Sequence, residues 1–357
     1  MLLSNLRAQI SARDGTEAVD LSVTGEQRQL VDSFAALFAR ESTSERIRAV
    51  EPSGFDLKLW KALQETGAVE MSVGEAAGGW GASELELGLI AEQFGRAVAS
   101  APLIEAQIAA RVLAQSGEAA KGLLSAVLAG EHLVTFAPRE ARGPRLGMVP
   151  GGAVADHVVA LVEGRLLAIP IGSNRNAVAN LASMPLADIT IDDEPVVLAE
   201  GSGAREMFST ALDLWLALTA IAMAAAAKRA VEMGVDYAKQ RHAFGTAIGT
   251  FQAVSHPLAD SATAADGARL LGLKAACAFA DEPDRVRELA AMAFAFAYET
   301  ARDATRRSLQ IHGGYGFGME GDIQLYYRRI RGWAMVFGDP ASALDRVADA
   351  RYGAVAG

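Results

Sequence analysis

The stretch RHAFGTAIGTFQAVSHPLAD, residues 241–260, decides the fold because it separates two long segments of helix-forming residues. The first segment covers 205–240, and the second begins near Phe251. Arg241 therefore lies at a helix C-terminus, with Gly245 closing the RHAFG motif. An arginine there either interacts with the last carbonyls of the helix or presents a fork-shaped donor to a diphosphate. The residues alone leave both roles open.

A second glycine-rich stretch, QIHGGYGFG at 310–318, ends another long helical segment that begins near Glu282. Gly313 and Gly314 stop the helix, and the glycines that follow let backbone amides approach a ligand closely. The same pattern is also an ordinary helix stop, since such glycine spacings are common. Further on, YYRRIRGW at 326–333 is a basic segment that we interpret as a solvated helix face.

Helices are also expected at both ends of the chain. Residues 1–130 show apolar residues at helical spacing, and Thr24 and Ser83 are each followed three residues later by Gln or Glu. This spacing predicts capping boxes at two helix starts. Residues 205–357 are predicted to form long helices with few loops, the last of them beginning near Pro340.

The middle of the chain, residues 131–204, differs from the helical segments in its residue pattern. Short β-branched segments alternate there with Gly, Pro and Asp, which predicts a small β-domain. EGR at 163–165 indicates a hairpin turn. We therefore expect a mostly α protein with a central β-domain, divided at 1–130, 131–204 and 205–357.

Composition excludes several classes of protein. Of the 357 residues, 51% are hydrophobic and 21% charged, which excludes global disorder. The net charge of −10 argues against a nucleic-acid binder, and the single cysteine, Cys277, excludes a disulfide framework or a cysteine-rich metal site. We predict no metal site. The apolar run Leu214–Ala227 is too short to span a bilayer, and MLLSNLRAQISARDG lacks the features of a signal peptide. We expect a soluble cytoplasmic protein with no membrane partner.

Three parts of the sequence, taken in order, resemble the acyl-CoA dehydrogenase family of flavoproteins, and the resemblance covers nearly the whole chain. They are the stretch EAAGGWGASELELGLIAEQFGRAVASAPL, residues 75–103, and the two glycine-containing C-terminal motifs. The resemblance implies an N-terminal helical domain, a middle β-domain and a C-terminal four-helix bundle. It also implies FAD as cofactor, an acyl-CoA thioester as substrate of α,β-desaturation, and an electron acceptor such as an electron-transfer flavoprotein.

In this family the flavin lies at a subunit interface, and the R-x-x-F-G and Q-x-x-G-G elements of one subunit hold the diphosphate and adenosine half of a flavin bound mostly by its neighbour. The resemblance assigns this cofactor-binding role to Arg241, Phe244, Phe251, Gln252, Gln310, Gly313 and Gly314.

The family's catalytic glutamate has no counterpart here. Counted without gaps from the Q-x-x-G-G element, its position falls on Phe337, and the glycine that follows it is kept as Gly338. A minority of members carry the base on the long helix before R-x-x-F-G, and that position falls on Trp215. An aromatic ring cannot abstract a proton but can fill an acyl cavity. We therefore predict no catalytic residue in this chain.

The elements with which a family member binds its own substrate and flavin are also altered. Asp213 matches a family aspartate that contacts the CoA part of the substrate, but the arginine expected three residues later is Leu216. The family's E-P-x-A-G-S-D stretch is replaced by TFAPREARGPRLG, residues 135–147. Asp213 or Asp339 could still act as a displaced base.

Three hypotheses remain open. The preferred one is a half-site subunit of a heteromeric acyl-CoA dehydrogenase, paired with a homologous subunit that carries the glutamate, plausibly as an α2β2 tetramer. Enzymes of this arrangement occur among bacterial steroid side-chain degraders. The alternatives are a homo-oligomeric dehydrogenase with a displaced base and a flavin-free assembly or regulatory protein.

Overall fold

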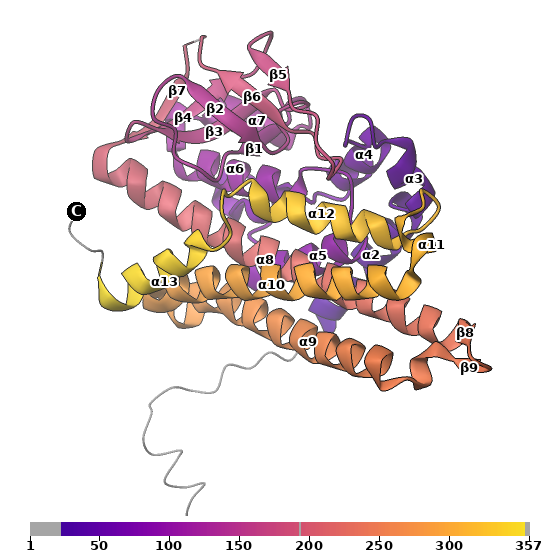
Figure 1. Cartoon of the computed structure of the whole chain (residues 1–357). Coiled ribbons are helices and arrows are strands. Elements are labelled where there is room, and N and C mark those ends of the chain that lie inside the picture. Colours follow the sequence, from indigo (N-terminus) through magenta and orange to yellow (C-terminus); the bar gives the residue numbers. More distant parts are fainter. Residues whose placement is uncertain (1–22, 193, 354–357) are drawn as a thin grey trace, which may run out of the picture.

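The computed structural model describes residues 23–192 and 194–353. The expectation for the first fifteen residues of the chain lies outside them. Helices open and close the described chain, and a β region lies between them, as expected (Figure 1). The helices before the β region, including three short 3-10 turns, are α2 (Gly25–Glu41), α3 (Ser44–Ala49), α4 (Leu57–Glu65), η1 (Glu70–Ser72), η2 (Glu75–Ala77), α5 (Glu84–Arg96), α6 (Leu103–Gln115), η3 (Gly117–Ala119) and α7 (Lys121–Leu128).

Both predicted capping boxes are present. The Thr24 hydroxyl accepts the Gln27 N–H at 3.2 Å, and the Gln27 side chain accepts the Thr24 N–H at 3.1 Å. The Ser83 N–H donates to the Glu86 carboxylate at 2.8 Å in the same way. Each box pairs N–H groups that a helix start otherwise leaves without a partner, so these starts are fixed by local sequence.

The β region forms two sheets, with strand orders β1-β3-β4-β7 and β2-β6-β5. The predicted hairpin joins β3 to β4, and Glu163 and Gly164 in its turn have φ values of 49° and 78°. Positive φ at both positions is the geometry that a two-residue hairpin turn requires. The strands are β1 (Val134–Phe136), β2 (Arg145–Val149), β3 (His157–Val162), β4 (Arg165–Pro170), β5 (Arg175–Ala177), β6 (Ala187–Thr190) and β7 (Val196–Glu200).

Long helices build the C-terminal part, in which α8, α9 and α10 lie alongside one another and α12 and α13 cover α10 (Figure 1). The first of them begins four residues earlier than expected, directly after β7. The elements are α8 (Gly201–Gln240), β8 (His242–Ala243), β9 (Thr246–Ala247), η4 (Ile248–Thr250), α9 (Gln252–Asp281), η5 (Pro283–Arg285), α10 (Val286–His312), α11 (Gly314–Phe317), α12 (Ile323–Met335) and α13 (Ser342–Tyr352).

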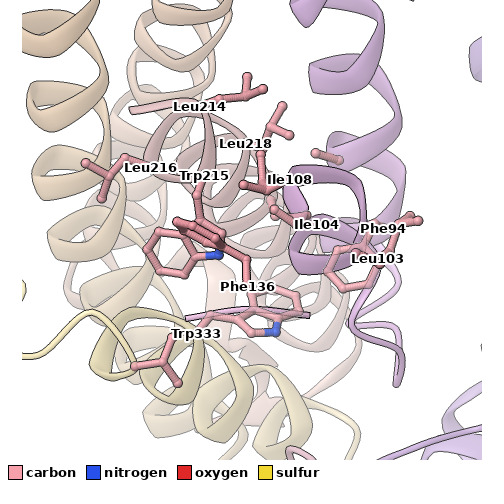
Figure 2. Close-up of a cluster of buried hydrophobic side chains, with 14 of the residues drawn as sticks. Phe94, Leu103, Ile104, Ile108, Phe136, Leu214, Trp215, Leu216, Leu218 and Trp333 are labelled. Carbon is pink, nitrogen blue, oxygen red and sulfur yellow. The ribbon is translucent and has the colours of Figure 1, made fainter. Parts of the chain in front are cut away.

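The core is centred on α8. By length and composition this helix could cross a membrane, but 89% of its most apolar window is buried inside the fold. Its side chains from Leu214 to Ala227 are all buried, so this apolar run is part of a buried core helix. Around it pack α6 and α12, as Figure 2 shows for Trp215, Ile108 and Trp333.

The interpretation of residues 326–333 as a solvated helix face is wrong for Arg329. Its guanidinium is buried and donates to the carbonyls of Ala182 and Ala99, at 3.0 and 2.8 Å, and to the Ser100 hydroxyl at 3.1 Å. Burial lowers the pKa of Arg329 to about 10. The arginine thus joins α12 to the turn between α5 and α6 and to a loop of the β region, where the carbonyl oxygens replace water as its partners.

Candidate functional site

The RHAFG motif lies at the exposed end of α8. The Arg241 N–H caps the helix by donating to the Tyr237 carbonyl at 2.8 Å, and within the described residues the Arg241 side chain has no hydrogen bond or ion pair. The chain then turns through β8 and β9, where Phe244 is 98% exposed and has a φ of 54°. Its ring meets that of Phe251 edge to face, with centroids 6.3 Å apart. Arg241 and Phe244 therefore expose a guanidinium group and an aromatic ring to solvent, although capping the helix needs only the backbone N–H of Arg241.

The Q-x-x-G-G element lies at the same end of the bundle (Figure 1). His312, in the last turn of α10, is buried, and its ring stacks on Tyr237 of α8 with centroids 4.5 Å apart. Gln310 is exposed, and a Cβ built on Gly313 or Gly314 would meet no atom within 4 Å. The Gly313 N–H caps α10 by donating to the Gln310 carbonyl at 3.1 Å, and the open space beside both glycines lets a ligand approach the backbone closely. We call this region, 241–252 with 310–314, the hairpin end.

Far from the hairpin end, the two positions that the resemblance predicts for the family's base lie against each other. The ring centroids of Trp215 and Phe337 are 6.4 Å apart and stacked, and both rings contact Phe294 of α10, at 5.8 and 5.4 Å. Trp215 and Phe294 are completely buried. These three residues form the aromatic cluster. Such offset and edge-to-face pairs are stabilising beyond the area they bury, so the space between α8 and α10 is filled by protein.

One carboxylate at this cluster was not predicted from the sequence. Glu105 of α6 is buried, and its Oε1 accepts the Trp215 Nε1–H at 3.1 Å. Burial raises the pKa of the Glu105 carboxyl, and the hydrogen bond from Trp215 only partly opposes this shift. The available signal was weak: Glu105 is a single charge among the buried apolar residues of α6, and nothing local indicated that it faces α8.

The two candidates for a displaced base have other partners. The Asp213 carboxylate is buried and ion-paired with Arg346 of α13, and burial raises its pKa against the effect of that positive charge. Asp339 is exposed, and its Oδ1 accepts the Ala341 N–H at 3.0 Å just before α13. Asp213 is thus held in an ion pair and Asp339 caps a turn, and neither observation supports a free base at the aromatic cluster.

The stretch that replaces the family's E-P-x-A-G-S-D motif crosses the β region beside Phe337. Arg139 Nη2 donates to the Gly147 carbonyl at 2.6 Å, and the Arg139 stem passes close to Gly338. The cavity left there is about 260 Å³ and is lined mainly by residues 137–141 and 146–149, with Val336 at one side. An arginine side chain therefore occupies part of the space between the β region and α12.

The hairpin end and the aromatic cluster are separate places on one helix. Trp215 and Arg241 lie on and directly after α8, and at a rise of about 1.5 Å per residue the helix separates them by roughly 39 Å. The structure therefore gathers most of the predicted cofactor-binding residues at one end and the altered base positions far from them. Within residues 23–192 and 194–353, no group of three or more His, Cys, Asp or Glu could hold a metal ion.

Models of one protein family match both helical parts of the chain. Residues 24–131 match the N-terminal domain model of the acyl-CoA dehydrogenases, and residues 202–351 match their C-terminal domain model. Together these matches span more than half of the chain.

Individual relatives cover the chain more fully. Acyl-CoA dehydrogenase IpdE2 from Mycolicibacterium smegmatis is 29% identical over 90% of this chain and 98% of its own length. The Tcur3481–Tcur3483 steroid ACAD G363A variant has a TM-score of 0.83 at 26% identity, covering 92% of this chain and 98% of the solved one.

The ChsE4–ChsE5 complex from Mycobacterium tuberculosis has a TM-score of 0.84 at 22% identity, with 95% of this chain and 100% of the solved chain covered, which shows the shared fold. This chain therefore belongs to the acyl-CoA dehydrogenase family of oxidoreductases, because both domain models match and its helical, β and long-helix regions follow one another in that order.

Proposed function

We propose that this chain is a subunit of a heteromeric FAD-dependent acyl-CoA dehydrogenase that contributes contacts to FAD across an interface and lacks a catalytic base of its own. The observation that carries the proposal is the contrast between the two regions. The hairpin end is exposed and open, whereas at the two predicted base positions the fully buried Trp215 stacks on the partly buried Phe337. A homologous subunit would supply the glutamate and the flavin-binding β-domain.

The hairpin end fits one half of a dinucleotide. Arg241 would donate to the diphosphate, since its guanidinium has no partner within the described residues and a fork of N–H groups suits phosphate oxygens. Phe244 and Phe251 offer aromatic faces, Gln252 and Gln310 offer side-chain amides, and the open space beside Gly313 and Gly314 lets a ligand approach the backbone closely. The flavin, when bound, supplies the two-electron oxidation of the acyl chain.

The region beside Phe337 does not fit a second flavin of this chain's own. The stem of Arg139 and the side chains of 146–149 border a cavity of only about 260 Å³, and the aromatic cluster closes the neighbouring space. One complete site per pair of unlike subunits follows from this asymmetry. An α2β2 assembly with two flavins is the simplest closed arrangement of such pairs.

A steroid side-chain acyl-CoA is the substrate class that we propose, with an electron-transfer flavoprotein as acceptor and the cytoplasm as location. The support for the substrate class is the likeness to the protein named as a steroid ACAD. In this arrangement a bulky acyl group would lie in the partner's cavity, because the corresponding space in this chain is filled by Trp215, Phe294 and Phe337.

The test is to purify the chain alone and after co-expression with a homologous subunit that carries the glutamate. We expect the single chain to be colourless and inactive, and the pair to be yellow, with one FAD per heterodimer and acyl-CoA-dependent reduction of a dye. A yellow chain that oxidises acyl-CoA by itself would establish the displaced-base alternative. A stable pair without flavin would favour the assembly protein instead.

A further inference from the structure

Trp215 is held in the aromatic cluster by more than packing. Its indole is completely buried, two aromatic neighbours contact it, and its Nε1–H donates to Glu105 Oε1 at 3.1 Å. An indole buried without an acceptor would leave its N–H unpaired, which destabilises the folded chain. Glu105 removes that cost, and it is the acceptor on α6 that reaches across to α8.

The choice of a carboxyl group for this task is itself unusual. A buried carboxylate is costly unless a cation pairs with it, and Glu105 has no salt bridge in the described part of the chain. Burial accordingly raises the pKa of the Glu105 carboxyl, which favours its neutral form over the carboxylate. An apolar residue would pack into α6 at lower cost, so the presence of the carboxyl group indicates that its hydrogen bond to the indole has a role.

We propose that Trp215 is a built-in occupant of the acyl cavity of this chain, and that Glu105 is the positioning residue that fixes the indole there through its N–H. The identification of this space as the acyl cavity rests on the proposed function. The cavity itself is then a site for one flat aromatic molecule with an N–H donor, and the protein fills it with its own side chain, which excludes an acyl chain from this subunit.

The proposal is tested by removing the indole side chain and then adding free indole. Trp215→Gly in the full chain removes the indole, and indole and indene, which have the same shape but differ in the N–H, are titrated separately by calorimetry. We expect indole to bind about 10-fold more tightly than indene, because one hydrogen bond to a buried acceptor amounts to about 1.4 kcal/mol. The wild-type chain is expected to bind neither.

Two matched variants identify the acceptor. In Trp215→Gly combined with Glu105→Leu, the preference for indole should fall to about one. In Trp215→Gly combined with Glu105→Gln, it should persist, because the amide oxygen still accepts. Equal binding of indole and indene to Trp215→Gly itself, or a preference that survives Glu105→Leu, would overturn the role of Glu105. Indole binding by the wild-type chain would show that Trp215 does not fill the site.

A second measurement keeps the proposal testable if Trp215→Gly does not fold. In the ¹⁵N-tryptophan-labelled chain, the indole N–H resonance of Trp215 is identified by its loss in Trp215→Phe. Glu105→Leu should move that resonance upfield and accelerate its exchange with water, whereas Glu105→Gln should restore both properties. An unchanged resonance in Glu105→Leu would overturn the proposal. Flavin content and activity of the single chain test the half-site function separately, so the two failures are distinguishable.

Discussion

The indole of Trp215 and the ring of Phe337 stack with their centroids 6.4 Å apart, although one belongs to α8 and the other follows α12. The resemblance places the two alternative bases of the family at these two positions. Because either base removes a proton from the same substrate carbon, the two positions are expected to lie close together. In this chain the two rings contact each other and share one space.

Phe337→Glu should therefore not create a dehydrogenase. The new carboxylate would enter a space bordered by the aromatic rings of Trp215 and Phe294, where partial burial among apolar groups disfavours a charge. We expect a lower melting temperature and no acyl-CoA-dependent dye reduction by the single chain. Phe337→Leu is the matched control, which should lose less stability. Robust activity of Phe337→Glu would show that the site was otherwise intact.

The features that the sequence predicted are those fixed by local rules. The helix start at Ser83 follows from a capping box, and the hairpin at 163–165 follows from a turn that needs positive φ. The start of α10 was placed four residues early, because Pro283 opens a separate 3-10 turn after Glu282. Such a boundary depends on a few weak preferences, so it is less certain than a cap.

What could not be predicted depends on packing between distant segments. Glu105 becomes significant only because α6 lies against α8 and brings its carboxyl group to the Trp215 indole. Arg329 looks like one more exposed arginine of a basic segment until the carbonyls of Ala99 and Ala182 are seen to surround it. In both cases the partners come from elements far away in the sequence, and periodicity carries no information about such pairs.

Arg241→Ala is expected to weaken retention of FAD in the heteromeric complex. The lost contact is a charge-assisted one of about 1.5–3 kcal/mol, which corresponds to roughly 10- to 100-fold in affinity. The FAD content after dialysis at rising salt measures the effect. The control is Arg165→Ala, an exposed arginine of β4 remote from the hairpin end, which should retain the flavin. Equal flavin content and affinity in Arg241→Ala would refute the assigned role.

Arg329→Met should destabilise the chain by about 3 kcal/mol or more, measured by urea unfolding. The substitution roughly conserves the side-chain stem, but it leaves the buried carbonyls of Ala99 and Ala182 and the Ser100 hydroxyl without a donor. The exposed Arg306 of α10 provides the comparison, because Arg306→Met should change stability by less than about 0.5 kcal/mol. Similar losses in the two variants would contradict the joining role of Arg329.

Glu105→Gln should make the chain progressively more stable than the wild type as the pH rises above about 4.5, the ordinary value for a glutamate. Burial raises the pKa of Glu105 in the folded chain, so above that pH the unfolded chain releases its proton while the folded chain keeps it. The wild-type contribution is therefore complete at low pH and is lost up to the raised pKa, at no more than about 1.4 kcal/mol per pH unit.

Glu105→Leu separates this titration from the hydrogen bond to Trp215. It also lacks the ionisable group, so its stability relative to the wild type should rise with pH along the same slope as that of Glu105→Gln. Because leucine accepts no hydrogen bond, its curve should lie below the glutamine curve by a constant amount of about 1–3 kcal/mol at every pH. Unfolding free energies of the three proteins between pH 4.5 and 8 measure both quantities. A pH-independent difference between wild type and glutamine variant would mean that Glu105 titrates alike in the folded and unfolded chains, and coincident variant curves would mean that the indole N–H gains nothing from its acceptor.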